Sequence, residues 1–265
     1  MKILIAVPTL DSWKTLTNLI YSLKIQTNPN WKLLIIDGKS SKEHVNYLKK
    51  ISKEDKRINF IKQNKKNKGI FGAMNQAFDL ADKEDFLLFW GSDESCYSDK
   101  TIDFLIKKLN HLMLYNNDRK LFIFDSEWIN NSGLKNKRLS FSKISHEHII
   151  NMDKYRFDLF WGYTQAHQAT LFSPSMRSIT KRYSTKFELA ADLDYFLRIS
   201  KNKTFQVIKI PKKIVLIGEG GISSRKNIKR FFEVMQAYFY SFGFAFIIPF
   251  ISRYIRRIFG KYLNK

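Results

Sequence analysis

The sequence is poor in cysteine, in proline and in acidic residues. Its 265 residues include a single cysteine, Cys96, so no disulfide can form within the chain and a reducing compartment is favoured. Five prolines and a hydrophobic share of 44% argue against widespread disorder. The apolar run at residues 3–7 is too short for the core of a signal peptide. We expect it to form a buried first strand instead.

Acidic residues are outnumbered by basic ones, 24 against 46, which gives a formal net charge of +22. Such an excess favours a polyanionic partner, which could be a nucleic acid, a nucleotide phosphate or an anionic membrane surface. No zinc-finger spacing and no RNA-recognition aromatic motif accompanies the charge, so we expect no nucleic-acid partner. His146 and His148 have the spacing of metal ligands, but no further cysteine or histidine cluster supports a zinc site.

The first hundred residues alternate short apolar runs with amphipathic segments of helical spacing. The runs of strand length occupy residues 3–7, 32–37, 58–61 and 86–90. Strands that are apolar on both faces and separated by helices predict a mostly parallel sheet covered on both sides. Ligands bind such sheets outside the carboxyl ends of the strands. Asp37, Asp93 and Glu94 stand at two of these ends.

From about residue 101 the pattern loosens. We predict helices at residues 102–114 and 189–200, and strands at residues 168–172, 205–210 and 213–217. The polar residues 130–143 are expected to form an exposed loop. No internal repeat and no linker divides the chain.

Residues 225–265 differ from the rest in being basic, aromatic and almost free of acids. Residues 234–251 make a poor spanning helix, because polar residues, a glycine and Pro249 interrupt them. Beyond Pro249, apolar residues recur at helical spacing, with Arg253 and Arg256 on the other side. This pattern is typical of a basic amphipathic helix lying in a membrane interface. The alternative is that the apolar stripe packs on the domain, and the sequence leaves both open.

Seven motifs, each weak alone, follow one another in a recognisable order. They are VPTLDSWKTLTNLIYSLKIQT, LLIIDGKSSKE, NKGIFGAMNQAFDLA, FLLFWGSDE, HQATLF, FELAADLDYFLR and EGGISS. In this order they resemble the family 2 glycosyltransferases, which transfer a sugar from a nucleotide-sugar with inversion. The resemblance covers roughly residues 2–224.

The resemblance implies an α/β chain of the GT-A fold, with a mostly parallel, Rossmann-like central sheet flanked by helices. It divides residues 1–224 into a nucleotide-sugar-binding half, residues 1–100, and an acceptor-binding half, residues 101–224. Residues 225–265 would then be a basic, amphipathic, membrane-associating helical tail.

The resemblance also implies roles on the donor side. Asp37, with the backbone of Pro8 and Thr9, would hold the base and ribose. Asp93 would contact the ribose or the metal hydration shell, and Glu94 would ligate Mn²⁺ or Mg²⁺. Such hard cations take carboxylate oxygens and neutralise a departing diphosphate. Further donor-site residues implied by the matching motifs are Asn67, Gly69, Asn75 and Ser92.

On the acceptor side, Asp192 matches the family's catalytic base. Inversion needs a carboxylate that takes the proton of the attacking hydroxyl. Asp194 lies about 200° further round the same helix, so both cannot point into one site. His167 and Gln168 fall in the acceptor-side strand, where His167 is expected to shape the pocket or satisfy a buried hydrogen bond.

Some positions depart from the family pattern. Glu94 replaces the more usual aspartate of the metal motif, Gly72 stands where relatives often carry aspartate, and Lys66 and Asn67 replace frequent acidic residues. We expect an inverting, metal-dependent enzyme of surface-polysaccharide synthesis, with a lipid-linked saccharide acceptor, at the cytoplasmic face of the cell membrane. The alternative is a glycosyltransferase-like binding or scaffold protein that has lost catalysis.

Overall fold

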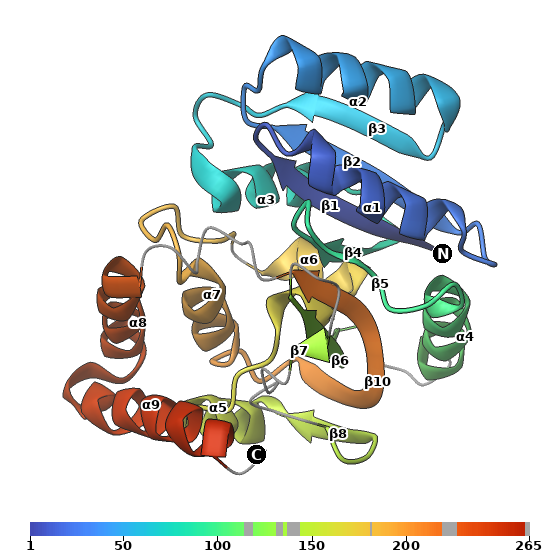
Figure 1. Ribbon diagram of the computed structural model, residues 1–265. Coiled ribbons are helices and arrows are strands. Elements are labelled where there is room, and N and C mark those ends of the chain that lie inside the picture. The colour runs from blue at the N-terminus through green and yellow to red at the C-terminus, as the bar shows by residue number, and fades with distance from the viewer. Residues whose placement is uncertain (114–118, 131–134, 137–143, 181, 219–226, 263–265) are drawn as a thin grey trace.

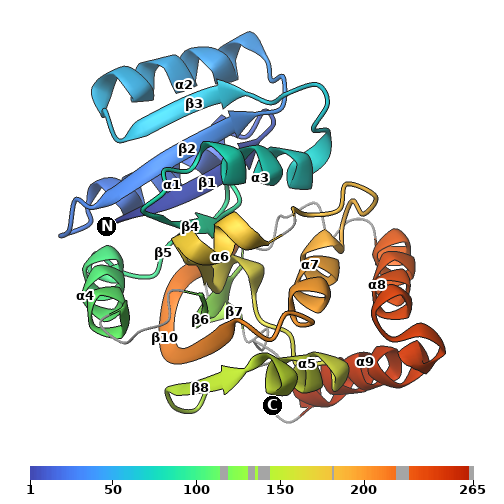
Figure 2. The same cartoon turned by 180° about the vertical axis from the view of Figure 1, so that it is seen from behind.

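A computed structural model describes residues 1–113, 119–130, 135–136, 144–180, 182–218 and 227–262 (Figures 1 and 2). Ten strands form one sheet in the order β3-β2-β1-β4-β9-β6-β10-β5, with β7 beside β6 and β8 beside β10. The expected exposed loop at residues 130–143 and the motif EGGISS lie largely or wholly outside the described residues.

The first half of the sheet is parallel, as the apolar runs predicted. It consists of β1 (Lys2–Thr9), β2 (Trp31–Asp37), β3 (Ile58–Lys62) and β4 (Asp85–Phe89). These strands alternate with α1 (Trp13–Lys24), α2 (Lys42–Glu54) and α3 (Gly69–Leu80). Because successive side chains of a strand point to opposite faces, Ile3 and Ile5 join one core layer while Leu4 and Ala6 join the other.

Helices cover both faces of the sheet. The layer with Ile3 contains the apolar residues of α1, α2 and α4 (Thr101–Met113). The layer with Leu4 contains those of α3, α6 (Pro174–Ile179), α7 (Ala191–Ile199) and α8 (Asn227–Phe242). The predicted helices at residues 102–114 and 189–200 are therefore confirmed as α4 and α7.

The second half of the sheet is mixed. The short β9 (Thr170–Phe172) is antiparallel to β4 and to β6 (Lys120–Ile129), while β6 is parallel to β10 (Gln206–Gly218). The two strands expected at residues 205–210 and 213–217 are one strand, because β10 continues past Pro211 through irregular pairing with β6. The remaining elements are β5 (Ser95–Cys96), β7 (Lys135–Asn136), β8 (His148–Asn151), α5 (Met152–Phe160) and η1 (His167–Ala169).

The tail forms α8, a short 3₁₀ turn η3 (Gly243–Phe246) and α9 (Ile247–Tyr262). Figure 1 shows α8 beside α7 and α9 beside α5. Val234, Ala237 and Tyr238 bury α8 against the domain. By length and apolar composition alone, one stretch of the described chain, Ile228–Arg256, could cross a membrane; its most apolar 18 residues have a mean hydropathy of 1.6.

The orientation of α9 does not match the alternative in which its apolar stripe packs on the domain. Arg253 is buried and donates to Thr164 Oγ1 at 2.9 Å, and Arg256 donates to the Trp161 carbonyl at 2.7 Å. Two arginines of the basic side therefore hold the helix on the domain. Much of the apolar side is exposed instead. The exposed apolar patch of α8, η3 and α9 consists of Ile228, Phe231, Phe232, Phe239, Tyr240, Phe244, Ile247, Ile248, Ile251 and Ile255.

Candidate donor and acceptor site

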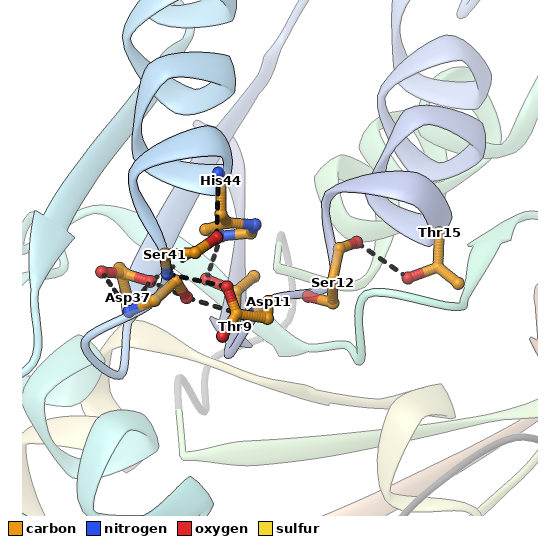
Figure 3. A network of polar contacts seen from close by, with 8 residues as sticks. Thr9, Asp11, Ser12, Thr15, Asp37, Ser41 and His44 are labelled. Carbon is orange, nitrogen blue, oxygen red and sulfur yellow. Dashed lines mark hydrogen bonds and ion pairs between the residues drawn. The ribbon is translucent and has the colours of Figure 1, made fainter.

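The carboxyl ends of β1 and β2 are joined by a buried polar network (Figure 3). Asp37, the last residue of β2, accepts a hydrogen bond from the Ser40 hydroxyl at 2.5 Å and lies 3.7 Å from His44 Nε2. The same nitrogen lies 3.3 Å from Thr9 Oγ1 at the end of β1. Burial lowers the pKa of His44 against the opposing charge of Asp37, so the imidazole is neutral at neutral pH. Thr9 and Asp37, both predicted for the donor site, therefore lie together, next to Pro8.

The loop after β1 adds contacts that the sequence did not reveal. Asp11 has a φ of 47°, accepts a hydrogen bond from the Ser41 amide at 2.7 Å and donates its own amide to Ser40 Oγ at 2.9 Å. The hydrogen bonds from Ser41 lower the pKa of Asp11. Asp11 and His44 escaped the sequence analysis because their partners lie about thirty positions away. Their network fixes the loops at the ends of β1 and β2.

The segment before α3 packs tightly on that helix. Gly69 begins α3 with a φ of 75°, and Gln63 Nε2 donates to the carbonyls of Asn67 and Gly69. A Cβ on Gly72 would lie 2.4 Å from the carbonyl carbon and oxygen of Asn67. The backbone of Asn67 therefore fills the space that any side chain at position 72 would need, which explains the glycine there.

Asn75 bridges the two halves of the domain. Its amide oxygen accepts from the Tyr183 amide at 2.8 Å, and its amide nitrogen donates to the Tyr183 carbonyl at 2.9 Å. Asn75 is buried, so these two bonds occupy a large part of its hydrogen-bonding capacity inside the protein. The residue predicted for the donor site thus contacts residue 183, in the half predicted to bind the acceptor.

The carboxylates of Asp93 and Glu94 converge after β4. The Gly91 amide donates to Glu94 Oε2 at 2.8 Å. A Cβ on Gly91 would lie 2.8 Å from Asp93 Oδ1 and 3.3 Å from Glu94 Oε1, and one on Gly218 would lie 3.0 Å from Asp93 Oδ2. The two carboxylates therefore pack together against Gly91, where any side chain would collide with them. Within the part of the chain that the structure describes, neither carboxylate forms an ion pair, and no group of three or more metal-ligating residues occurs.

Burial and the neighbouring Asp93 charge shift the ionisation of this pair. Burial, followed by the charge of Asp93, raises the pKa of Glu94 to about 8, and burial also raises the pKa of Asp93. The side chain of Gln168 hydrogen-bonds Glu94, and the Gln168 carbonyl accepts from Trp90 Nε1 at 2.9 Å. Predicted donor and acceptor residues therefore meet here. Ser92 lies nearby in sequence and accepts a hydrogen bond from Thr15 Oγ1 at 3.2 Å.

His167 lies at the boundary with the acceptor half. It is buried, stacks on Phe89 with ring centroids 5.5 Å apart, and its Nε2 lies 2.6 Å from Tyr183 Oη. Burial lowers the pKa of His167 to about 4, against the opposing charge of Asp192. The imidazole is therefore neutral, and the carboxylate of Asp192 is close enough to act on it electrostatically.

Two aspartates of α7 have different surroundings. Asp194 is buried, and its Oδ2 accepts from Arg198 Nε at 2.8 Å. Arg198 also donates to the Arg182 carbonyl at 2.9 Å, so its guanidinium holds this part of the fold together. Asp192 is half-buried near the start of α7 and accepts a hydrogen bond only from the amide of Leu193, at 2.8 Å, among the described residues. Its carboxylate is available to a substrate.

Comparison with known proteins shows the family of the chain. The sequence pattern of Glycosyl transferase family 2 matches residues 4–172. The chain belongs to this family. No curated protein matches the chain. The sheet order and the structural similarities described next identify the fold as GT-A, as the sequence predicted.

The fold is similar to solved glycosyltransferase structures at low sequence identity. TarS of S. aureus, residues 1–349 with UDP-GlcNAc, has a TM-score of 0.67 and 15% identity over 90% of this chain and 66% of that chain. The mannosyltransferase PcManGT from Pyrobaculum calidifontis, with GDP-Man and Mn²⁺, has a TM-score of 0.62 and 10% identity over 89% of this chain and 63% of that one. This chain spans just under two thirds of each of these two chains.

Proposed function

We propose that this protein is an inverting, metal-dependent glycosyltransferase that moves a sugar from a nucleotide-diphosphate sugar to a hydroxyl of a saccharide acceptor. The observation that carries the proposal is the convergence of the Asp93 and Glu94 carboxylates beside Gly91, at the same sheet edge as Asp37. Nucleotide-sugars bound to TarS and PcManGT, which share the fold, support the same donor class.

On the donor side, Asp37 and the ends of β1 and β2 would hold the nucleoside. The carboxylates of Asp93 and Glu94 fit a divalent cation, because two neighbouring acids converge beside Gly91 without a basic partner among the described residues. A cation held there supplies a Lewis acid that neutralises the charge of the departing diphosphate. Glu94 would have to lose its proton first, since burial raises its pKa to about 8 in the metal-free protein.

On the acceptor side, Asp192 would take the proton of the attacking hydroxyl. General-base catalysis of this kind contributes about 10²–10⁴-fold to a rate. Asp194 is not available for this step because it is buried in its ion pair with Arg198. His167 and Gln168 would line the acceptor pocket between the base and the carboxylate pair.

We also propose that the tail places the enzyme on the inner, cytoplasmic face of the cell membrane, where a lipid-linked acceptor of surface-polysaccharide synthesis would be found. The exposed apolar patch supports this, since apolar surface that leaves water for the bilayer interface gains about 25 cal/mol per Å². The described part of the tail contains one acidic residue, Glu233. It is buried, and its carboxylate accepts hydrogen bonds from the backbone amides of residues 188–190. An anionic lipid surface thus meets no exposed acid there.

Flotation with vesicles that contain an anionic phospholipid tests the membrane proposal. Replacing Ile247 and Ile251 together by serine should reduce binding at least about tenfold, since two isoleucines leave the interface. Leu80→Ser, which changes an exposed apolar residue on α3, should leave binding unchanged. Equal binding by the wild type and the double variant would contradict the proposal.

Titration with UDP-, GDP- and dTDP-sugars, with and without Mn²⁺, tests the donor assignment and separates an enzyme from a scaffold. We expect one nucleotide class to bind and Mn²⁺ to strengthen the binding, and we expect Asp93→Asn to remove the Mn²⁺ effect. A scaffold that has lost the donor site would bind none of them in a metal-dependent way.

A further inference from the structure

Tyr183 and His167 form a buried hydrogen-bonded pair, and the direction of the hydrogen bond between them can be assigned. The Tyr183 side chain is 3% exposed and His167 is 7% exposed, and the two polar atoms lie 2.6 Å apart. A buried hydroxyl hydrogen needs an acceptor, since leaving it unpaired costs about 1–3 kcal/mol. Among the described residues, His167 Nε2 is the only hydrogen-bond partner of the Tyr183 hydroxyl. The hydroxyl therefore donates, and Nε2 accepts.

The direction of this bond decides the tautomer of His167. A neutral imidazole carries one hydrogen, and a nitrogen that accepts a hydrogen bond in the ring plane cannot carry it. The hydrogen then belongs on Nδ1. Stacking on Phe89 prevents the ring from turning freely to exchange its two nitrogens.

The second nitrogen of His167 is free to meet a substrate. Within the described part of the chain, Nδ1 of His44 is a fully buried atom without a hydrogen-bond partner. Nδ1 of His167 is not among the atoms of this kind. Among the described residues no group hydrogen-bonds Nδ1 of His167, so this nitrogen keeps its hydrogen-bonding capacity for a substrate. The carboxylate of Asp192 acts electrostatically on both His167 and Tyr183, so the pair lies in the same region of the domain as the proposed base.

Asn75 holds Tyr183 in position from the donor side. Its two hydrogen bonds fix both the amide and the carbonyl of Tyr183, 108 positions further along the chain. Phe71 and Phe78 of the same helix contact the Tyr183 ring at 5.4 Å and 5.6 Å between centroids. The position of the hydroxyl is therefore set by α3.

We propose that Tyr183, held by Asn75, fixes His167 as the Nδ1–H tautomer and so makes it a hydrogen-bond donor to an oxygen of the acceptor saccharide beside Asp192. His167 binds and orients the acceptor, while Tyr183 and Asn75 are positioning residues. This inference rests on the proposed function for the identity of the acceptor, but the tautomer itself does not depend on it.

Nitrogen-15 NMR of the full-length protein with ring-labelled histidine tests the tautomer directly. The wild type should show a His167 signal with a protonated Nδ1 and an unprotonated Nε2, assigned by its loss in His167→Gln. Tyr183→Phe should shift that signal toward a protonated Nε2. A protonated Nε2 in the wild type would overturn the proposal, and the wild-type spectrum decides this even where the variant fails to fold.

Kinetics then test the role of the donor nitrogen. Tyr183→Phe should raise the KM for the acceptor about tenfold, as expected for one lost hydrogen bond, and leave the KM for the nucleotide-sugar unchanged. Equal increases in both KM values would indicate a general structural loss and overturn the positioning role. Absence of any transfer by the wild type, with the Nδ1–H signal present, would contradict the proposed function and leave the tautomer assignment standing.

Discussion

Asp194 and Arg198 form an ion pair along one turn of α7, with 2.8 Å between Oδ2 and Nε. The acid is buried, the base is partly exposed, and Arg198 also binds the Arg182 carbonyl. Asp194→Asn should therefore lower the free energy of unfolding by about 1.5–3 kcal/mol, the range for a hydrogen bond to a charged group. Denaturant unfolding measures this. Asp192→Asn is the matched control and should change stability by less than about 0.5 kcal/mol, and equal losses would contradict the distinction between the two aspartates.

Gly72 gives a test of the loop before α3. In Gly72→Ala the new methyl group would lie 2.4 Å from the Asn67 backbone, so the loop at residues 64–68 must move. We expect a loss of about 1–3 kcal/mol in the free energy of unfolding, together with weaker nucleotide-sugar binding. Leu80→Ala, at the exposed end of the same helix, should change neither. Normal stability and donor binding in Gly72→Ala would contradict the close packing.

Glu94 predicts a pH dependence of stability for the metal-free protein. Burial, followed by the charge of Asp93, raises the pKa of Glu94 from 4.5 to about 8, so the folded state holds a proton that the unfolded state has lost. The contribution of this proton to the free energy of unfolding is fully present below pH 4.5, and it is lost as the pH rises toward 8.

Glu94→Gln isolates this contribution, because its amide oxygen can still accept from the Gly91 amide and all other titrating groups are shared. Urea unfolding in the presence of a chelator should show the wild type losing stability relative to Glu94→Gln between pH 4.5 and about 8. Parallel pH profiles for the two proteins would contradict the raised pKa. Added Mn²⁺ should stabilise the wild type more at high pH than at low pH, since the ligand must be deprotonated.

Gly162 connects the tail to the domain. It has a φ of 78°, and a Cβ there would lie 2.7 Å from the Cα of Arg253. Gly162→Ala should displace α9 and expose it to limited proteolysis. Gly243→Ala is a matched control, because Gly243 has a φ of 58° with open space around it, so it carries the left-handed strain of about 1–2 kcal/mol without the clash. Equal cleavage of the two variants would contradict a docked α9.

The fold was predictable where apolar runs are long. The runs ending near Asp37 and Trp90 gave the parallel strands β2 and β4, because only buried strands are apolar on both faces. The two-residue β5 and the half-exposed β8 were not predicted, since both are defined by pairing with the distant β10. Pro211 looked like a break between strands, yet β10 continues past it.

The candidate site was predictable as a set of acids at strand ends, but its contacts were not. The order of motifs placed Asp37 and Glu94 at the correct ends of their strands. It did not reveal that Glu94 turns back to the Gly91 amide or that Asn75 binds Tyr183, because those contacts depend on tertiary packing.

The orientation of the tail was likewise not predictable from the sequence. The spacing of residues separated the apolar side of α9 from its basic side. Only contacts such as the hydrogen bond from Arg256 to the Trp161 carbonyl, 95 positions away, show which side faces the domain.

The central claim is that Asp192 is the base of a sugar transfer. It is tested most directly by release of nucleoside diphosphate from a panel of donor sugars, with a membrane lipid extract as acceptor, for the wild type and Asp192→Asn. We expect the wild type to turn over one donor, and Asp192→Asn to bind that donor with an unchanged Kd while kcat falls by about 10²–10⁴-fold. Full turnover by Asp192→Asn would contradict the account.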